Sequence, residues 1–214
     1  MIRNLKVLGL ALASVLAMAA VTASAASATP EFHSAVEHTI LTAEQVAGVE
    51  GEQKFNTPAG NVTCKKVIGK GTTTTKTTMS ITAEDITYKE CKTKTIFGEI
   101  SVEVDFKGCD YKFTTATEPV HIECPAGSGP ITISGPGCTI TVGAQTVSSV
   151  SYVNTTPEGG KKDIDIVPNV TNISGSATGA FCSKTGAFTS GTYSGKVTVR
   201  GFNTAEEQVD IWYE

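Results

Sequence analysis

Short segments in which apolar and polar residues alternate make up much of the chain. Residues 101–106 alternate strictly, with Val102, Val104 and Phe106 on one side and Ser101, Glu103 and Asp105 on the other. Alternation with a period of two places the apolar side chains on one face of a β-strand. Clusters of Gly, Pro and Asn, which are typical of turns, separate further segments of this kind at residues 131–134, 138–142, 146–153, 164–167, 170–174, 193–202 and 208–213. The pattern predicts many short antiparallel strands, with a hairpin at the C-terminus.

Helical signals are weak in comparison. Residues 42–45 match a helix capping box, but no apolar stripe with a period of 3.6 follows, so a strand is the better interpretation there. Threonine is frequent and often adjoins Val or Ile, which is the usage of half-exposed strands. The fold is therefore expected to be all-β, as a disulfide-stabilised antiparallel β-sandwich or a barrel-like fold. It is expected to span residues 38–214, as one unit or as two small β lobes at residues 38–116 and 117–214.

The first 28 residues have the pattern of a secretory signal peptide. Arg3 and Lys6 precede a run of small and apolar residues at positions 7–21, which is shorter than the roughly 20 residues that a membrane-spanning helix needs. Cleavage is expected after Ala25 or Ala28. The polar segment of residues 29–37 is expected to be flexible. We therefore expect a secreted protein with no stable membrane insertion after cleavage.

Composition and charge exclude several classes of partner. The 214-residue chain has a net charge of −4 and a pI near 5.5, whereas proteins that bind nucleic acids or anionic membranes usually carry a basic excess. Loss of Arg3 and Lys6 with the signal peptide makes the net charge −6, and mutual repulsion then favours a soluble monomer. The expected partner is an unknown extracellular or cell-surface component, and no nucleic acid.

Six cysteines lie in the expected mature part of the chain, and an even number in an exported protein indicates disulfides. They are Cys64, Cys91, Cys109, Cys124, Cys138 and Cys182. A zinc site is disfavoured because the sequence has no C-x-x-C pair, and residues three apart in a strand, such as His121 and Cys124, point to opposite faces.

The register of one hairpin predicts the first disulfide. If residues 108–113 pair with residues 120–124, Tyr111 lies opposite Ile122 and Cys109 lies opposite Cys124 on the same face. Directly opposed residues of antiparallel strands have the spacing that a disulfide can bridge. Of the remaining cysteines, Cys64 and Cys91 are preferred as a pair because they are close in sequence, which leaves Cys138 with Cys182.

Motifs for common chemistry are absent from the sequence. It contains no nucleophile elbow, no phosphate-binding loop, no dinucleotide fingerprint and no H-E-x-x-H helix. The pairs Glu103 with Asp105 and Asp163 with Asp165 could serve a glycosidase or calcium, but the water-facing side of a strand explains them better. His121 is likewise interpreted as a solvated strand residue. No catalytic residue, metal ligand or cofactor is therefore predicted.

Trp212 is the one aromatic residue that suggests a contact with a partner. In the alternating C-terminal segment, Val209, Ile211 and Tyr213 face one way, and Trp212 faces the other way together with polar residues. A tryptophan on a polar face can bind a carbohydrate or a protein, although covering a sheet edge is its commoner role.

Four segments follow one another in a recognisable order along the chain. They are FNTPAGNVTC at residues 55–64, GCDY at 108–111, IECPAG at 122–127, and Cys182 followed by GTYSGKVTV at 191–199. In this arrangement the chain resembles a group of exported, Cys-containing β-rich proteins of actinobacteria whose function is not known. The resemblance implies export and a disulfide-bonded β fold, and it implies no activity.

Three functional hypotheses follow for a secreted β protein of this kind. The first is a non-enzymatic module that binds an envelope or extracellular component or is itself structural. The second is an inhibitor or ligand-binding protein that acts through loops such as residues 114–119 or 127–130. The third is a secreted hydrolase whose carboxylates converge from distant strands. Because the sequence has no catalytic motif, we expect a protein that is not an enzyme.

The mass of the exported protein tests both the signal peptide and the disulfides. It should correspond to cleavage after Ala25 or Ala28, and it should rise by about 6 Da on reduction, because each of three bridges takes up two hydrogens. Intact-mass spectrometry before and after reduction measures both quantities. Free thiols or bound metal in the unreduced protein would contradict the disulfide framework.

Overall fold

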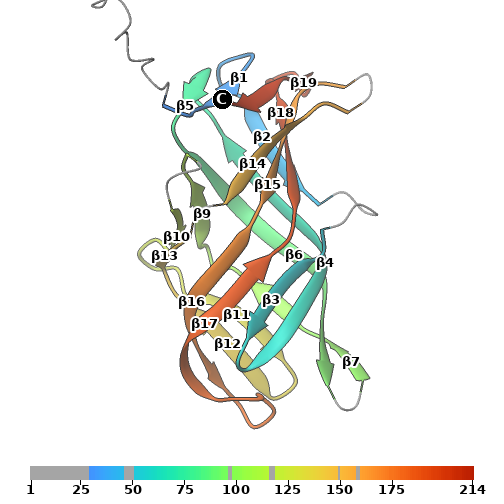
Figure 1. The fold of residues 1–214 in the computed structure, drawn as a ribbon, viewed down its shortest axis with the longest axis vertical. Coiled ribbons are helices and arrows are strands. Elements are labelled where there is room, and N and C mark those ends of the chain that lie inside the picture. The colour runs from blue at the N-terminus through green and yellow to red at the C-terminus, as the bar shows by residue number, and fades with distance from the viewer. Residues whose placement is uncertain (1–28, 46–50, 96–97, 116–118, 149, 158–159) are drawn as a thin grey trace, which may run out of the picture.

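The computed structural model describes residues 29–45, 51–95, 98–115, 119–148, 150–157 and 160–214. The expected signal peptide, residues 1–28, lies outside these ranges. The described residues contain strands, turns and bends but no helix, and every strand pairing is antiparallel (Figure 1). The all-β prediction is thus confirmed, including a strand rather than a helix at residues 42–44.

Twenty strands follow one another along the described chain. They are β1 Phe32–Ser34, β2 Ile40–Glu44, β3 Gln53–Thr57, β4 Gly60–Thr72, β5 Thr77–Thr78, β6 Ile81–Thr95, β7 Gly98–Ser101, β8 Glu103–Asp105, β9 Asp110–Phe113, β10 Val120–Glu123, β11 Ile131–Gly135, β12 Cys138–Val142, β13 Gln145–Val147, β14 Ser151–Thr155, β15 Asp163–Val167, β16 Asn169–Thr178, β17 Gly186–Ser194, β18 Val197–Phe202, β19 Gln208–Val209 and β20 Ile211–Tyr213.

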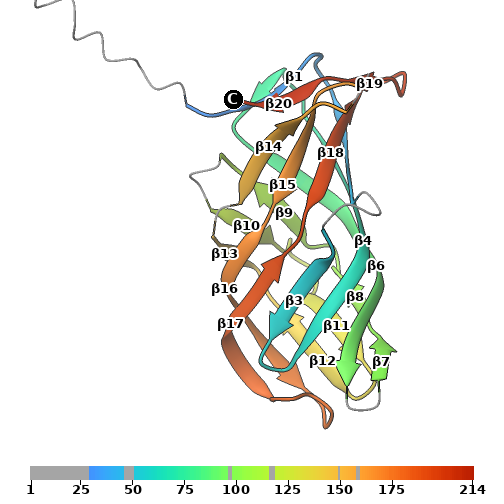
Figure 2. The same ribbon diagram turned by 45° about the vertical axis from the view of Figure 1, so that its right-hand side comes forward.

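Most strands join in one elongated, barrel-like fold. Followed from neighbour to neighbour, the pairings lead from β6 through β4, β3, β17, β16, β12, β11 and the β8–β7 segment back to β6. At the other end β2 takes the place of β3 beside β4, and β9 takes the place of β7 beside β6. The long strands β4 and β6 therefore extend through both ends of the fold (Figure 2).

The strands before and after residue 116 share this one fold and its core. β3 pairs with β17, β2 with β18, and β8 with β11. Inward side chains from both parts, such as Val62 and Val199, belong to one continuous hydrophobic cluster. The two segments therefore do not form separate lobes, because each supplies neighbours to the other's strands.

A small sheet closes the upper end of the barrel, in the order β20–β1–β5 (Figure 1). The expectation of a flexible segment at residues 29–37 is wrong, because β1 pairs with β20 over residues 32–34. Phe32 is buried and packs edge-on against Tyr152, with ring centroids 5.0 Å apart. This burial depends on Tyr152 of β14 and Tyr213 of β20, which lie far along the chain, so local polarity could not indicate it.

The C-terminal hairpin is confirmed only in part. β18 and β19 pair around the turn at residues 203–206, with Phe202 opposite Gln208. After Val209 the chain leaves β18, and β20 pairs with β1 instead. The strand expected at residues 146–153 is similarly split into β13 and β14, which have different partners.

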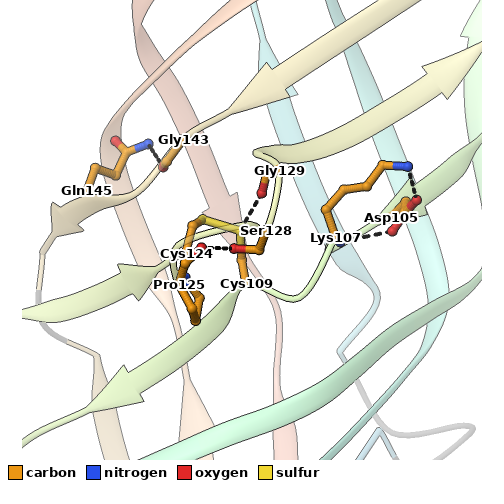
Figure 3. Close-up of a disulfide and its surroundings, with 9 residues drawn as sticks. All are labelled: Asp105, Lys107, Cys109, Cys124, Pro125, Ser128, Gly129, Gly143 and Gln145. Atoms are coloured by element: carbon orange, nitrogen blue, oxygen red, sulfur yellow. Dashed lines mark hydrogen bonds and ion pairs between the residues drawn. A yellow bond between two sulfur atoms is a disulfide. The ribbon is translucent and has the colours of Figure 1, made fainter.

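All three predicted disulfides are present, and none of the six cysteines is free. The hairpin register is confirmed as well, with Ile122 opposite Tyr111, so the Cys109–Cys124 bridge joins the ends of β9 and β10. Figure 3 shows this bridge beside the turn at residues 125–128, where Ser128 Oγ donates a hydrogen bond to the Pro125 carbonyl oxygen at 2.6 Å. Cys64 and Cys91 lie directly opposite each other on β4 and β6.

Removal of a disulfide should weaken the fold according to the length of the loop that it closes. Replacing both cysteines by alanine should lower the free energy of unfolding by about 3 kcal/mol for Cys109–Cys124 and about 4 kcal/mol for Cys138–Cys182, whose cysteines are separated by 15 and 44 residues. Urea denaturation measures both losses. A loss below about 1 kcal/mol for either pair would contradict this expectation.

Candidate functional site

The barrel encloses an apolar cavity of about 110 Å³. Inward side chains from both parts of the chain line it, among them Val67 of β4, Ile86 of β6, Val142 of β12 and Ile166 of β15. Apart from three tyrosines, every lining residue is aliphatic, phenylalanine, proline or glycine. The alternation of the strands thus produces an interior wall with almost no polar groups.

Two small residues explain why the interior is not filled. Ala43 of β2 lies directly opposite Gly69 of β4, and both line the cavity. An apolar cavity of roughly 150 Å³ stays free of water and holds benzene or xenon, so this cavity suits a molecule of about one small ring.

Three tyrosines are the only residues with a polar side-chain group among the described residues that line the cavity. Tyr88 comes from β6, Tyr111 from β9 and Tyr193 from β17. The Tyr88 and Tyr193 hydroxyl oxygens are 3.0 Å apart, and Tyr111 packs edge-on against Phe106, with ring centroids 5.2 Å apart. Phe55 supports the group, with its ring stacked on that of Tyr193 at a centroid distance of 4.7 Å.

All three phenols keep their protons at physiological pH. Burial raises the pKa of Tyr111 to about 12. Burial also raises the pKa of Tyr193 and holds that of Tyr88 well above its ordinary value, because the apolar surroundings disfavour a phenolate. The described residues that line the cavity therefore carry no charge at physiological pH.

The buried side chain of Gln53 anchors this tyrosine group. Its Nε2 donates hydrogen bonds of 2.9 Å to the carbonyl oxygens of Gly51 and Lys196, and its Oε1 accepts one from the Tyr193 hydroxyl. Gly195 has to lack a side chain here, because a Cβ at that position would overlap the Gln53 amide. Gln53 therefore links the start of β3 to the junction of β17 and β18.

Asp163 and Asp165, interpreted from the sequence as the wet side of a strand, are in fact buried. Asp165 contacts Lys196, with Nζ 2.5 Å from Oδ2, and accepts a hydrogen bond of 2.7 Å from Thr198 Oγ1. Both partners come from the β17–β18 part of the chain, so the sequence of β15 alone could not reveal the burial. Side chains of neighbouring segments thus hold both carboxylates. Both lie on the side of β15 that faces away from the cavity residue Ile166.

The negative charge of Asp163 is less well compensated by its neighbours than that of Asp165. Its Oδ1 accepts a 2.9 Å hydrogen bond from Gln208 Nε2, and Arg200 Nε lies 3.4 Å from its Oδ2. Burial raises the pKa of the Asp163 carboxyl, against the opposing effects of Gln208 and Arg200. The arrangement is a buried ion pair between Asp163 and Arg200.

The other predicted acidic pair, Glu103 and Asp105, lines an open groove together with Glu84, Asp85 and Asp110. Lys107 lies 2.6 Å from Asp105 and lowers the pKa of that carboxyl. Within the described part of the chain, no group of three or more His, Cys, Asp or Glu side chains is arranged to hold a metal ion. The groove therefore offers dispersed surface charge and no assembled site.

Trp212 lies on the small upper sheet, away from the cavity. Its ring stacks on His33 at a centroid distance of 5.2 Å, and Lys162 Nζ lies 5.4 Å from the ring centroid. Trp212 Nε1 also donates a 3.1 Å hydrogen bond to Glu214. These contacts account for the position of the ring, and its contact with an external partner stays a prediction. His121 bonds only Thr146 among the contacts described, at 3.1 Å.

The cavity residues were not recognised as a site from the sequence. The hairpin register places Tyr111 on the same face as Ile122 and the disulfide, but Tyr88 and Tyr193 come from strands whose proximity is a property of the closed barrel. The sequence signal that could have identified these residues is a polar residue on the inward face of a strand in which apolar and polar residues alternate. Tyr88, two positions after Ile86, is an example. That signal identifies single residues and not their convergence.

Comparisons with protein-family models, with curated proteins and with solved structures find no match. In the described residues, no helix is long and apolar enough to span a membrane. The site therefore has to be interpreted from its own geometry.

Removal of the Arg200 cation should destabilise the fold in a pH-dependent manner. Arg200→Met should lower the free energy of unfolding at pH 7 by about 3 kcal/mol, because it leaves the buried Asp163 charge uncompensated. A carboxyl with a raised pKa in the folded state favours folding at low pH and disfavours it as the pH rises through that pKa. The loss should therefore shrink as the pH falls toward 4.

Urea denaturation at several pH values measures this effect, with Asp163→Asn/Arg200→Met as the control. The double variant should lose less stability at pH 7 and should lack the additional pH dependence. Equal losses for Arg200→Met at pH 7 and pH 4 would show that Asp163 does not carry the effect.

Proposed function

We propose that this protein is an exported, non-enzymatic β-barrel that binds one small, largely apolar molecule inside its cavity. The observation that carries the proposal is the apolar cavity of about 110 Å³, whose lining includes three tyrosines. Barrels of about eight strands either fill their interior with side chains or hold one small ligand. An apolar pocket with a few convergent polar groups is the usual form of a small-molecule site.

Two features support export as part of this proposal. The N-terminal pattern of residues 1–28 is that of a secretory signal peptide. Three disulfides also suit an oxidising compartment, where such bonds form and persist. An extracellular or cell-surface location follows from the two features together.

The lack of reactive groups at the cavity supports a binding role over catalysis. Among the described residues, its lining side chains include no carboxylate, histidine, amine or thiol, and its phenols are neutral at physiological pH. General acid–base catalysis needs a group whose pKa lies near the working pH. The carboxylate pairs considered for a hydrolase lie outside this cavity, in the Asp163 ion pair and the open groove at Glu103.

Ligand binding should raise the stability of the protein and should be lost when the cavity is filled. A single-ring probe such as phenol at 100 times its dissociation constant should add about 2.7 kcal/mol to the free energy of unfolding. Val142→Phe places a larger ring in the cavity wall and should weaken phenol binding at least about tenfold, at a cost in stability of roughly 1–3 kcal/mol.

Calorimetric titration and thermal unfolding measure these two effects. The matched control is Val153→Phe, the same substitution at an exposed position of β14, which should bind phenol like the unaltered protein. Absence of binding for a panel of single-ring probes, or equal binding by Val142→Phe, would contradict the proposal.

A further inference from the structure

The wall of the cavity has a break beside the first half of β16. One edge of β16 pairs with β17, but its other edge pairs with β12 only from Ser176 to Thr178. β13 is an edge strand, because β10 is its one ladder partner among the described strands. β13 lies beside β16 (Figures 1 and 2), yet in the described part of the chain no ladder pairing joins the two. Side chains therefore have to close the wall at this point.

The side chain of Gln145 takes the place of a strand partner in this break. Its Nε2 donates a hydrogen bond of 2.9 Å to the Ser174 carbonyl oxygen, and its Oε1 accepts one of 2.8 Å from the Ser174 N–H. Opposed residues of antiparallel strands exchange the same two kinds of hydrogen bond through their backbones. The Gln145 amide thus holds β13 to β16 where the two backbones do not pair.

Cavity residues flank the break on both sides. Val147 of β13 lines the cavity on one side, and Val170 and Ile173 of β16 line it on the other. Ile173 is only half-buried, whereas Val147 and Val170 are buried. The cavity wall is therefore thin at Ile173, and separation of the two strands here would connect the cavity with solvent.

A second break lies between β6 and β8, but an aromatic ring blocks it. Between Ala83 and Lys92, one edge of β6 has no ladder partner in the described chain. Phe106, which follows β8, is buried here and packs against Tyr88 and Tyr111, with ring centroids 5.6 and 5.2 Å apart. The three cavity residues named beside the break between β13 and β16 are aliphatic and include no ring.

We propose that ligands enter and leave the cavity between β13 and β16, and that the Gln145 side chain holds this passage closed. The proposal rests on the proposed function, since it concerns access to the same site. Parting two strands of a ladder breaks a series of backbone hydrogen bonds, whereas parting these strands breaks the two bonds between Gln145 and Ser174. Irregularities interrupt the β16–β17 ladder on both sides of Ile173, so this part of β16 can move with few further bonds broken.

Replacement of Gln145 should speed up ligand exchange without changing the affinity. Loss of the two hydrogen bonds should raise the population of the open passage about tenfold. Entry and exit both use this passage, so in Gln145→Ala the association and dissociation rate constants should rise together by about tenfold. The dissociation constant should stay the same within about a factor of two, because the bound state itself is unaltered.

Fluorobenzene serves as the probe in these measurements. Exchange spectroscopy of its ¹⁹F NMR signals gives the dissociation rate constant, and calorimetric titration gives the dissociation constant. Gln145→Met retains the length of the side chain but neither hydrogen bond, so it should behave like Gln145→Ala. Circular dichroism establishes that each variant is folded, and two substitutions are used so that failure of one to fold leaves the other.

The matched control is Asn56→Ala. Asn56 is an exposed amide whose Nδ2 donates a 3.3 Å hydrogen bond to Thr192 Oγ1, between strands β3 and β17. These two strands are already joined by a backbone ladder at this pair of residues. Fluorobenzene should therefore exchange with Asn56→Ala at the rate of the unaltered protein.

The outcomes distinguish this proposal from the proposed function. Unchanged exchange rates in both Gln145 variants, or equal acceleration in Asn56→Ala, would overturn the passage and leave the cavity as a ligand site. Faster dissociation with an equal loss of affinity would also overturn it, because Gln145 would then support the bound state and not the passage. Absence of binding to the unaltered protein for fluorobenzene and the other single-ring probes would overturn both.

Discussion

The pairing of β4 with β6 is the interaction on which the rest of the fold depends. These two strands are the longest in the described chain, and each has different partners at its two ends, so their alignment sets the register of the whole barrel. The Cys64–Cys91 bridge joins them at directly opposed positions and prevents a slip of one residue, which would turn every inward side chain outward. A closed interior with one face of each strand directed inward follows from this alignment.

Closure of the barrel creates the cavity as well as the core. Where Ala43 meets Gly69, the wall supplies too little volume to fill the axis, and the space is bounded by β-branched residues and three phenols. The same closure brings Gln53 of β3 against the junction of β17 and β18, where its amide is held by two carbonyl oxygens. The direction of the hydrogen bond from Tyr193 is therefore a consequence of backbone geometry, since those carbonyl oxygens orient the amide and its oxygen accepts the proton of the Tyr193 hydroxyl.

Local features of the fold could be predicted from the sequence, and long-range ones could not. The Cys109–Cys124 bridge was predictable because the hairpin places its partners within 15 residues and alternation sets their faces. The burial of Phe32 and of Asp163 was not, because it depends on β20 for the first and on Arg200 and Gln208 for the second. The tyrosine group is the strongest example. Its members lie on β6, β9 and β17, and alternation shows that each points inward without showing that the three meet.

The measurement that tests the central claim most directly is a crystal structure of the protein with bound phenol. The account predicts electron density for one phenol molecule inside the barrel, among residues such as Val142 and Ile166. Phenol bound only on the outer surface, or an interior in which the side chains close over the space and leave no room for a ligand, would contradict the account.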